Sequence, residues 1–233
     1  MFKNLFSLKN FFLKENLFSY LFSLIIIILF IGFIYSIFIS PTDYIQGDSV
    51  RIMYVHVPSS IISLGCFVFI GTASIFSLIF KIKFMPLIGR SFAPVGCIFS
   101  VISLVTGSLW GKPTWGIWWV WDARLTSMLI LFIFYLFYIF TWKLITNYEK
   151  ANKIASIIGI IGMINVVLIR NSVEWWNTLH QPSSITLTSI PTIHYTMIIP
   201  LLIMFLGMIA YSFLIFLMRY KTELMKIKLK KDK

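Results

Sequence analysis

The sequence predicts an all-α membrane protein with six transmembrane helices, and three observations carry this prediction. Of the 233 residues, 59% are hydrophobic and only 12% are charged, whereas a soluble domain is about 45–50% apolar and about 25% charged. Six apolar stretches approach the roughly 20 residues that a helix needs to cross a bilayer core of about 30 Å. The basic residues, finally, alternate between the two sides of these stretches.

The predicted spans are 21–39, 61–80, 92–110, 125–142, 154–169 and 197–217. The fifth is short, so we expect its helix to borrow neighbouring residues. The first follows Lys3, Lys9 and Lys14 as a signal peptide would, but it is too long and no small-residue cleavage site follows it. We therefore interpret 1–233 as one integral-membrane domain that ends in a basic tail at 219–233.

The charge pattern predicts an orientation. Sixteen of the 20 Lys and Arg residues lie before the first span, after the last, or in the second and fourth loops. The other four are Arg51, Lys112, Arg124 and Arg170. Because cytoplasmic loops are enriched in Lys and Arg, both termini are predicted to face the cytoplasm, or the matrix in an organelle. The basic tail is then an anchor near anionic lipid.

Two classes of function fit poorly. A net charge of +12 would indicate nucleic-acid binding in a soluble protein, but here the charge follows the inner loops and the tail, so we expect no nucleic-acid partner. Cys66 and Cys97 both fall within apolar runs and form neither a CxxC nor a zinc spacing. We interpret them as small buried apolar residues, which excludes a thiol–disulfide role.

The outer segments hold the chemically varied residues, so a functional site is expected there. They contain all three histidines and seven of the eight tryptophans: His56, His180 and His194, and Trp110, Trp115, Trp118, Trp119, Trp121, Trp175 and Trp176. An aromatic belt places tryptophans singly at both membrane interfaces. Here five of them fall within 110–121, between the third and fourth spans.

This tryptophan-rich segment predicts an interfacial helix with an indole face. Trp115, Trp118, Trp119 and Asp122 fall at i, i+3, i+4 and i+7. Such a face would suit a flat, apolar ligand, although an aromatic belt that only packs is an equal alternative. Asp122 and Arg124 close the segment and have three possible roles: to pair with each other, to cap the next helix, or to meet a charged ligand edge.

Two histidines share a local pattern, since His56 and His180 each begin a copy of HxPSSI. Proline restricts its predecessor to extended geometry, so we expect both histidines just before a chain turn and at similar depth. A histidine hydrogen-bonded in a loop is the alternative for each. Neutral imidazole binds iron, and the thiols or clustered carboxylates of zinc and calcium sites are missing from the pattern. Haem, with two axial imidazoles and an aromatic face, fits best.

Longer motifs carry a family resemblance. The run 115–127, with Trp118-Trp119-Val-Trp121-Asp122 at its centre, resembles the tryptophan-rich WWD signature of haem-handling proteins. Segments 47–58, 105–113 and 172–181 resemble the cytochrome c maturation protein C family, also called haem exporter protein C. Six spans with both termini inside agree with that family.

The resemblance implies a function and a site. It implies that haem b is a transient cargo, held at the outer face of a bacterial or mitochondrial inner membrane between axial His56 and His180. The implied platform is Trp115, Trp118, Trp119, Trp121 and Asp122, with Trp175 and Trp176 as outer-loop support, and with Arg51 or Arg124 facing the propionates. His194 and the loop 183–191 have no counterpart in these motifs.

The resemblance also implies partners. Haem passes to a small membrane-anchored haem chaperone of the system I cytochrome c maturation pathway. ATP-binding-cassette subunits and a small membrane adaptor complete the complex. The protein is then a haem-binding and delivery protein embedded in a lipid bilayer, and not an enzyme.

Three other functions remain to be weighed. A bis-histidine b-type cytochrome would carry its histidines inside the spans, where the sequence places none. A transporter would place ionisable groups near the midplane, but the spans lack acidic residues and, apart from Asn165, offer mainly Ser and Thr. A structural scaffold would purify without haem absorbance.

Overall fold

The computed structural model describes residues 15–181 and 193–231, which form a bundle of six long helices. In chain order these are α2 (Glu15–Ile34, continued by the π-helical turn η1, Tyr35–Ile39), α3 (Met53–Leu78, preceded by the 3-10 turn η2, Asp48–Ile52), α4 (Met85–Trp115), α5 (Ala123–Leu144), α6 (Tyr148–Trp175) and α7 (Tyr195–Lys231). All six are long and apolar enough to cross a membrane. The predicted all-α fold class and number of spans are confirmed.

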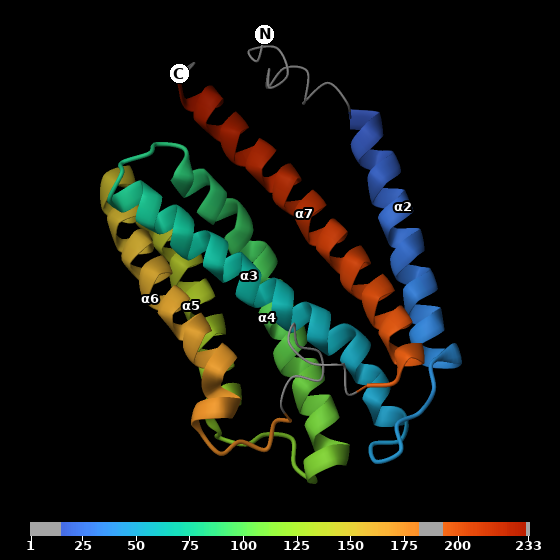
Figure 1. Ribbon diagram of the computed structural model, residues 1–233. Helices are drawn as coiled ribbons and strands as arrows, with labels where there is room; N and C mark the ends of the chain where they lie inside the picture. Colours follow the sequence, from blue (N-terminus) through green and yellow to red (C-terminus); the bar gives the residue numbers. More distant parts are fainter. Residues whose placement is uncertain (1–14, 182–192, 232–233) are drawn as a thin grey trace.

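The helices form two groups. Helices α3, α4, α5 and α6 pack together, and α2 and α7 lie side by side along this group, with α7 touching α3 and α4 (Figure 1). The start of α2 and the end of α7 lie at the same end of the bundle, as an even number of crossings requires. Which side of the membrane this end faces stays a prediction. We call it the inner end, and the opposite end the outer end.

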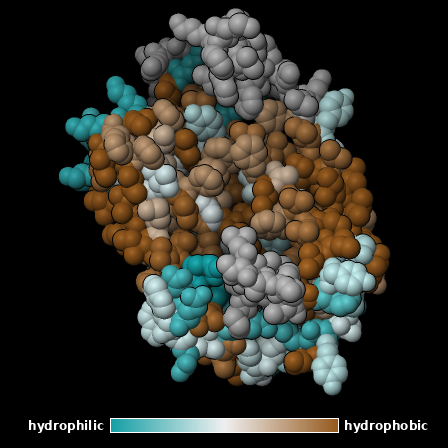
Figure 2. Space-filling model, viewed as in Figure 1, coloured by the Kyte–Doolittle hydropathy of each residue, from teal (hydrophilic) through white to brown (hydrophobic). Residues whose placement is uncertain are grey.

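The surface has the polarity of a membrane protein. On the face seen in Figure 2, a broad hydrophobic band crosses the middle, and hydrophilic residues gather towards the two ends. Large apolar side chains inside the long helices are exposed, such as Phe69 of α3 at 56%, Ile98 of α4 at 62% and Leu206 of α7 at 63%. Exposure to lipid carries no hydrophobic penalty, because the acyl tails are as apolar as these side chains.

The core depends on close approach between helices. Tyr135 of α5 is fully buried and donates a hydrogen bond of 2.6 Å to the carbonyl of Ser63 on α3. A Cβ added at Gly96 of α4 would lie 2.0 Å from the Tyr135 hydroxyl. Tyr138, one turn further along α5, meets Gly89 in the same way at 2.3 Å. Only glycine fits at these two positions, so α4 and α5 are locked in one register.

The helices are longer than the predicted spans. The fifth borrows residues at both ends, as expected, because α6 covers 28 residues from Tyr148 to Trp175. Helix α7 has 37 residues, or about 55 Å of helix, and so exceeds a bilayer core of about 30 Å. The basic tail thus continues α7 as far as Lys231. The second predicted span was wrong at its end, since α3 stops at Leu78.

Candidate functional site

His56 lies on a helix, in the second turn of α3, so the prediction that it precedes a chain turn is wrong. Helix α3 continues directly from η2 and contains Pro58. A proline this close to a helix start removes a single backbone hydrogen bond, which the helix tolerates. The hydroxyl of Ser60 also donates to the His56 carbonyl at 2.9 Å. His56 is thus carried by a helix, at the fourth residue of α3 and not in the interior of a span.

The imidazole of His56 is fixed against α4. Its Nδ1 lies 3.1 Å from the carbonyl oxygen of Ser103 and 3.1 Å from the hydroxyl of Thr106. A carbonyl only accepts hydrogen bonds, so Nδ1 carries the hydrogen and the lone pair is on Nε2. A Cβ added at Gly107 would lie 3.0 Å from Cε1 of this ring. Nε2 is the nitrogen left to bind a metal.

His180 follows α6, in an irregular segment at the outer end. Its Nδ1 donates to the carbonyl of Gln181 at 2.8 Å, which again leaves the lone pair on Nε2. The indole of Trp115 lies 6.4 Å away between ring centroids. Burial lowers the pKa of His180, and the charge of Arg124 lowers it further. The imidazole is therefore neutral around pH 7, which is the form that binds iron. The rest of the second HxPSSI copy, 182–185, lies outside the described residues.

The fold brings the two histidines together. His56 lies on α3, and His180 lies in the segment that follows α6. Each imidazole has an indole of α4 as a neighbour, Trp110 for His56 and Trp115 for His180, with ring centroids 5.7 and 6.4 Å apart. The charge of Arg124 acts on both rings. Both histidines lie at the outer end of the bundle, whereas their local conformations differ; that the two imidazoles lie at similar depth stays a prediction.

The tryptophan-rich segment is helical only as far as Trp115, so the predicted single helical face is wrong. Helix α4 runs through Trp115 and ends at Gly116, whose φ of 79° is left-handed and whose N–H bonds the Lys112 carbonyl. A glycine in this conformation terminates a helix. Residues 116–122 then run without helical hydrogen bonds to α5. Trp115 and Trp118 therefore belong to different local structures.

The connection between α4 and α5 still gathers the indoles. Trp119 and Trp121 pack edge to face, with ring centroids 5.6 Å apart. Lys112 lies over the ring of Trp118 at 5.9 Å. Trp118 is 54% and Trp121 76% exposed, so both present apolar area outward. The indole Nε1 of Trp119 is buried and has no hydrogen-bond partner among the described residues, so a ligand acceptor would satisfy it.

Asp122 caps the helix that follows, which selects one of its three predicted roles. Its Oδ1 accepts a 2.8 Å hydrogen bond from the backbone N–H of Leu125, the usual arrangement at a helix start. Its other oxygen, Oδ2, is buried without a hydrogen-bond partner within the described part of the chain. The carboxylate therefore keeps an acceptor for a ligand or its bound water.

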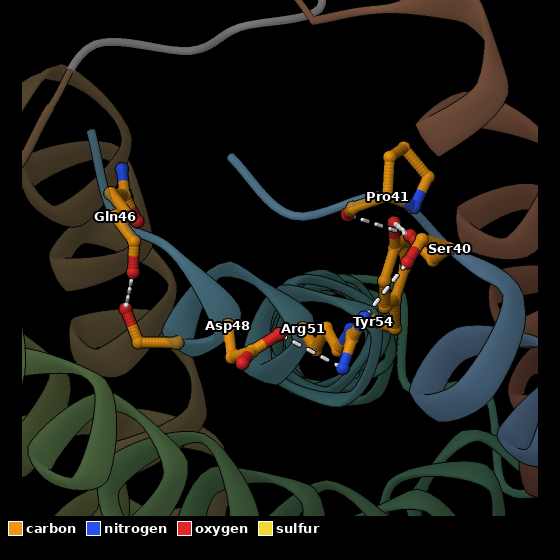
Figure 3. A network of polar contacts seen from close by, with 7 residues as sticks. Ser40, Pro41, Gln46, Asp48, Arg51 and Tyr54 are labelled. Atoms are coloured by element: carbon orange, nitrogen blue, oxygen red, sulfur yellow. Dashed lines mark hydrogen bonds and ion pairs between the residues drawn. The ribbon is translucent and has the colours of Figure 1, made fainter. Parts of the chain in front are cut away.

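Arg51 is engaged in holding the first outer loop. Its guanidinium pairs with Asp48 at 2.9 Å and donates to the Ser40 carbonyl at 3.1 Å (Figure 3). The hydroxyl of Ser40 in turn hydrogen-bonds Tyr54, which is fully buried. Of the two arginines predicted to face propionates, Arg124 is thus the one whose charge acts on both histidines.

The remaining predicted residues lie at the outer end. Trp175 closes α6 and stacks edge to face on Trp176 at 5.8 Å, and both are about half exposed. His194 precedes α7 and is exposed, with Nδ1 2.7 Å from the hydroxyl of Thr196. The loop 183–191, which has no counterpart in the family motifs, lies outside the described residues.

Sequence reasoning missed the residues that hold His56. These are Ser103, Thr106 and Gly107 on α4, and Trp110, whose indole stands against the imidazole. A signal was present: Ser100, Ser103, Gly107 and Gly111 recur every three or four residues and form a small-residue stripe. Such a stripe favours close approach of another helix. Gln46, which bonds Trp110, gave no sequence signal.

The donor set fits haem better than a bare metal ion. Within 15–181 and 193–231, no three His, Cys, Asp or Glu side chains group as ligands for a metal ion. A porphyrin supplies four nitrogen ligands to its own iron, so two imidazoles complete the coordination. The indoles suit the apolar ring of such a molecule. The buried Nε1 of Trp119 and Oδ2 of Asp122, which lack a partner among the described residues, suit its polar edge.

Comparison with known proteins identifies the family. A family model described as haem exporter protein C matches residues 2–233. The chain is 40% identical over 203 residues to the haem exporter protein C of Haemophilus influenzae, covering 87% of this chain and 82% of the relative. It is 43% identical over 159 residues to that of Escherichia coli, covering 68% of this chain and 65% of the relative. It is also 41% identical over 170 residues to a ccmC-like mitochondrial protein of Marchantia polymorpha named for cytochrome c biosynthesis, covering 73% and 72%. With its six membrane-length helices and this match, the chain belongs to the haem exporter protein C family.

Proposed function

We propose that this protein binds haem b at the outer end of the bundle, between His56 and His180, and delivers it to the haem chaperone of c-type cytochrome biogenesis. Membership of the haem exporter protein C family supports a role in haem export and cytochrome c biogenesis. One relative is bacterial and another is named as a mitochondrial protein, which supports an inner membrane as the location. The cargo is taken up and released, so it is a substrate of the protein and no resident group.

One observation carries the proposal. Both imidazoles use Nδ1–H to donate to a backbone carbonyl, of Ser103 for His56 and of Gln181 for His180. Such a hydrogen bond fixes the ring and raises the basicity of the opposite nitrogen. Two histidines in the same tautomer, each beside an indole of α4, offer two Nε2 lone pairs for the two faces of a six-coordinate haem iron.

The tryptophans supply the surface for the porphyrin and for its release. A well-placed aromatic contact contributes about 0.5–1.5 kcal/mol beyond the area it buries. Because Trp118 and Trp121 are also exposed, a partner can reach the same surface. Fully burying haem would slow its transfer, whereas lipid alone would give no control over it. An exposed indole surface allows both binding and handover.

Arg124 is the best candidate to face the haem propionates. It lies in the first turn of α5, next to Asp122, and its charge acts on both histidines. Guanidinium groups bind carboxylates strongly and with two hydrogen bonds. The step needs no bond breaking in the cargo, so a catalytic acid–base pair has no task here. We therefore propose a binding and delivery protein, and not an enzyme.

Partners follow from the delivery step. The receiving protein is a small membrane-anchored haem chaperone that approaches the outer end. ATP-binding-cassette subunits and a small membrane adaptor would release the loaded chaperone. Passage of haem across the bilayer by this chain is not required.

Haem content of the purified protein tests the proposal. The chain is produced in a haem-replete host, purified in detergent, and its haem per polypeptide measured by pyridine haemochrome absorbance. His56→Ala and His180→Ala are each expected to lose most of the haem. His194→Ala is the matched control, because His194 is an exposed histidine at the same end, and it should keep wild-type haem. Full haem in both site variants would refute the proposal.

A further inference from the structure

We infer that Gln46 is a positioning residue that ties the two halves of the haem site together and so sets the spacing of His56 and His180. This inference rests on the proposed function. Gln46 lies in the first outer loop, outside every motif that the sequence singled out. Its side chain joins the α3–α4 side of the site to the segment that follows α6.

The bridge consists of two hydrogen bonds. The Nε1–H of Trp110 donates to Gln46 Oε1 at 2.7 Å. Gln46 Nε2 donates to Gln181 Oε1 at 3.2 Å. An indole N–H only donates, so its partner must be the amide oxygen of Gln46. This fixes the orientation of the amide and leaves its NH₂ group for Gln181.

Each bond leads to one of the two histidines. Trp110 stands edge-on against His56, with ring centroids 5.7 Å apart. Gln181 is the neighbour of His180, and its carbonyl accepts the Nδ1–H of that imidazole at 2.8 Å. One side chain thus links the indole that supports one imidazole to the residue that orients the other.

The backbone around Gln46 is itself held firmly, so the amide has a fixed origin. Asp43 accepts hydrogen bonds from the N–H groups of Ile45 and Gln46, at 2.9 and 2.8 Å. Asp43 and Gly47 exchange two backbone hydrogen bonds across the turn, at 3.2 and 3.0 Å. Ser49 donates to the Gln46 carbonyl at 2.6 Å (Figure 3). A rigid turn can transmit a distance, whereas a loose loop cannot.

The consequence concerns the iron and not the binding of haem as such. Without the bridge, the segment that carries His180 loses its hydrogen-bonded link to Trp110 of α4 and keeps the ring contact of His180 with Trp115, while His56 keeps Ser103 and Thr106. His180 is then the ligand that leaves the iron. Part of the haem becomes five-coordinate and high-spin, and it dissociates faster.

The test uses the full chain loaded with ferric haem b in lipid nanodiscs. Gln46→Met keeps the size of the side chain and removes both hydrogen bonds. We expect it to retain haem, with a raised high-spin fraction and about tenfold faster transfer of haem to apomyoglobin, the usual scale for outer-shell partners of a metal ligand. Added free imidazole should restore the low-spin spectrum, because it replaces the missing ligand.

Controls separate this inference from its alternatives. Tyr44→Ala alters the same turn at a side chain that is fully exposed, and it should leave the spectrum unchanged. Gln181→Leu removes one of the two bonds from outside the turn, and it should show the same high-spin shift even if Gln46→Met folds poorly. A low-spin spectrum and wild-type transfer rate in Gln46→Met and Gln181→Leu would overturn the inference, as would an equal shift in Tyr44→Ala. If His56→Ala and His180→Ala leave the spectrum unchanged, the proposed function itself fails.

Discussion

The indole of Trp110 stands edge-on against the imidazole of His56, with ring centroids 5.7 Å apart and ring planes at 78°. Nδ1 of the same imidazole bonds the carbonyl of Ser103, and Gly107, about one helical turn further along α4, lies against its Cε1. His56 is therefore confined by α4 on several sides and has little freedom to turn. A side chain held in this way would lose little entropy on binding a haem iron, as the proposed function requires.

The confinement of His56 predicts the effect of Gly107→Ala. The added Cβ would lie 3.0 Å from His56 Cε1, so the ring must shift and its Nδ1 hydrogen bonds must weaken. We expect haem per polypeptide to fall several-fold, measured by haemochrome absorbance at equal protein. Gly65→Ala on α3 is the control, since nothing lies within 4 Å of its Cβ, and it should bind normally. Equal haem in both variants would show that this close approach does not orient the ligand.

We expect the loss of tryptophans from the α4–α5 connection to reduce the delivery of haem. Trp118→Ala combined with Trp119→Ala removes two aromatic contacts, each of about 0.5–1.5 kcal/mol. Haem transfer to the chaperone in isolated membranes should fall about tenfold, while membrane insertion changes less. Trp142→Ala at the inner end is the control: it removes an indole from the opposite end of α5, and transfer per inserted molecule should stay unchanged. If the double variant transferred haem at the wild-type rate, these indoles would act only as membrane anchors.

Asp122 has two separable roles that two substitutions can distinguish. Asp122→Ala removes the cap that accepts the Leu125 N–H, and we expect the unfolding free energy to fall by about 1 kcal/mol. Asp122→Asn keeps an oxygen for the cap and removes the charge, so its stability should remain near wild type. Denaturant unfolding in detergent measures both. Equal destabilisation by the two changes would mean that the charge, and not the cap, stabilises the start of α5.

We expect substitutions of Arg124 and Arg51 to differ in how they change the affinities for haem and for its dimethyl ester, which lacks the propionate charges. Arg124→Gln should weaken binding of haem about tenfold, because it removes a charged hydrogen-bond partner, but should leave binding of haem dimethyl ester unchanged. Arg51→Gln loses contacts to Asp48 and Ser40 within the loop, so it should weaken both ligands equally. Spectroscopic titration of each variant with each ligand gives the four affinities. If Arg51→Gln alone lost affinity for haem and kept its affinity for the dimethyl ester, the propionates would have to lie at the first outer loop and not at Arg124.

Much of the fold was predictable because lipid imposes a simple rule. Length and hydropathy located six helices, since a bilayer core demands about 20 apolar residues in each crossing. The predicted helical face failed at Gly116, which ends α4 and separates Trp115 from Trp118. A glycine at this position was a sequence signal for the end of the helix. Periodicity alone does not reveal a left-handed residue.

The sequence could indicate the two candidate histidines but not the residues that hold them. The resemblance and the paired HxPSSI pattern indicated His56 and His180, and the fold places both at the outer end. Which face of α4 meets α3 depends on packing, so Ser103 and Thr106 could not be chosen from the sequence. Gln46 acts through contacts to residues 64 and 135 positions away, and no local pattern records such distances.

The coordination state of the bound iron tests the central claim most directly. Electron paramagnetic resonance of the wild-type ferric complex should show a low-spin, bis-imidazole signal. His56→Ala and His180→Ala should each convert the haem that remains to high-spin iron, and free imidazole should reverse the conversion. A bis-imidazole signal that persists in both variants would contradict the account.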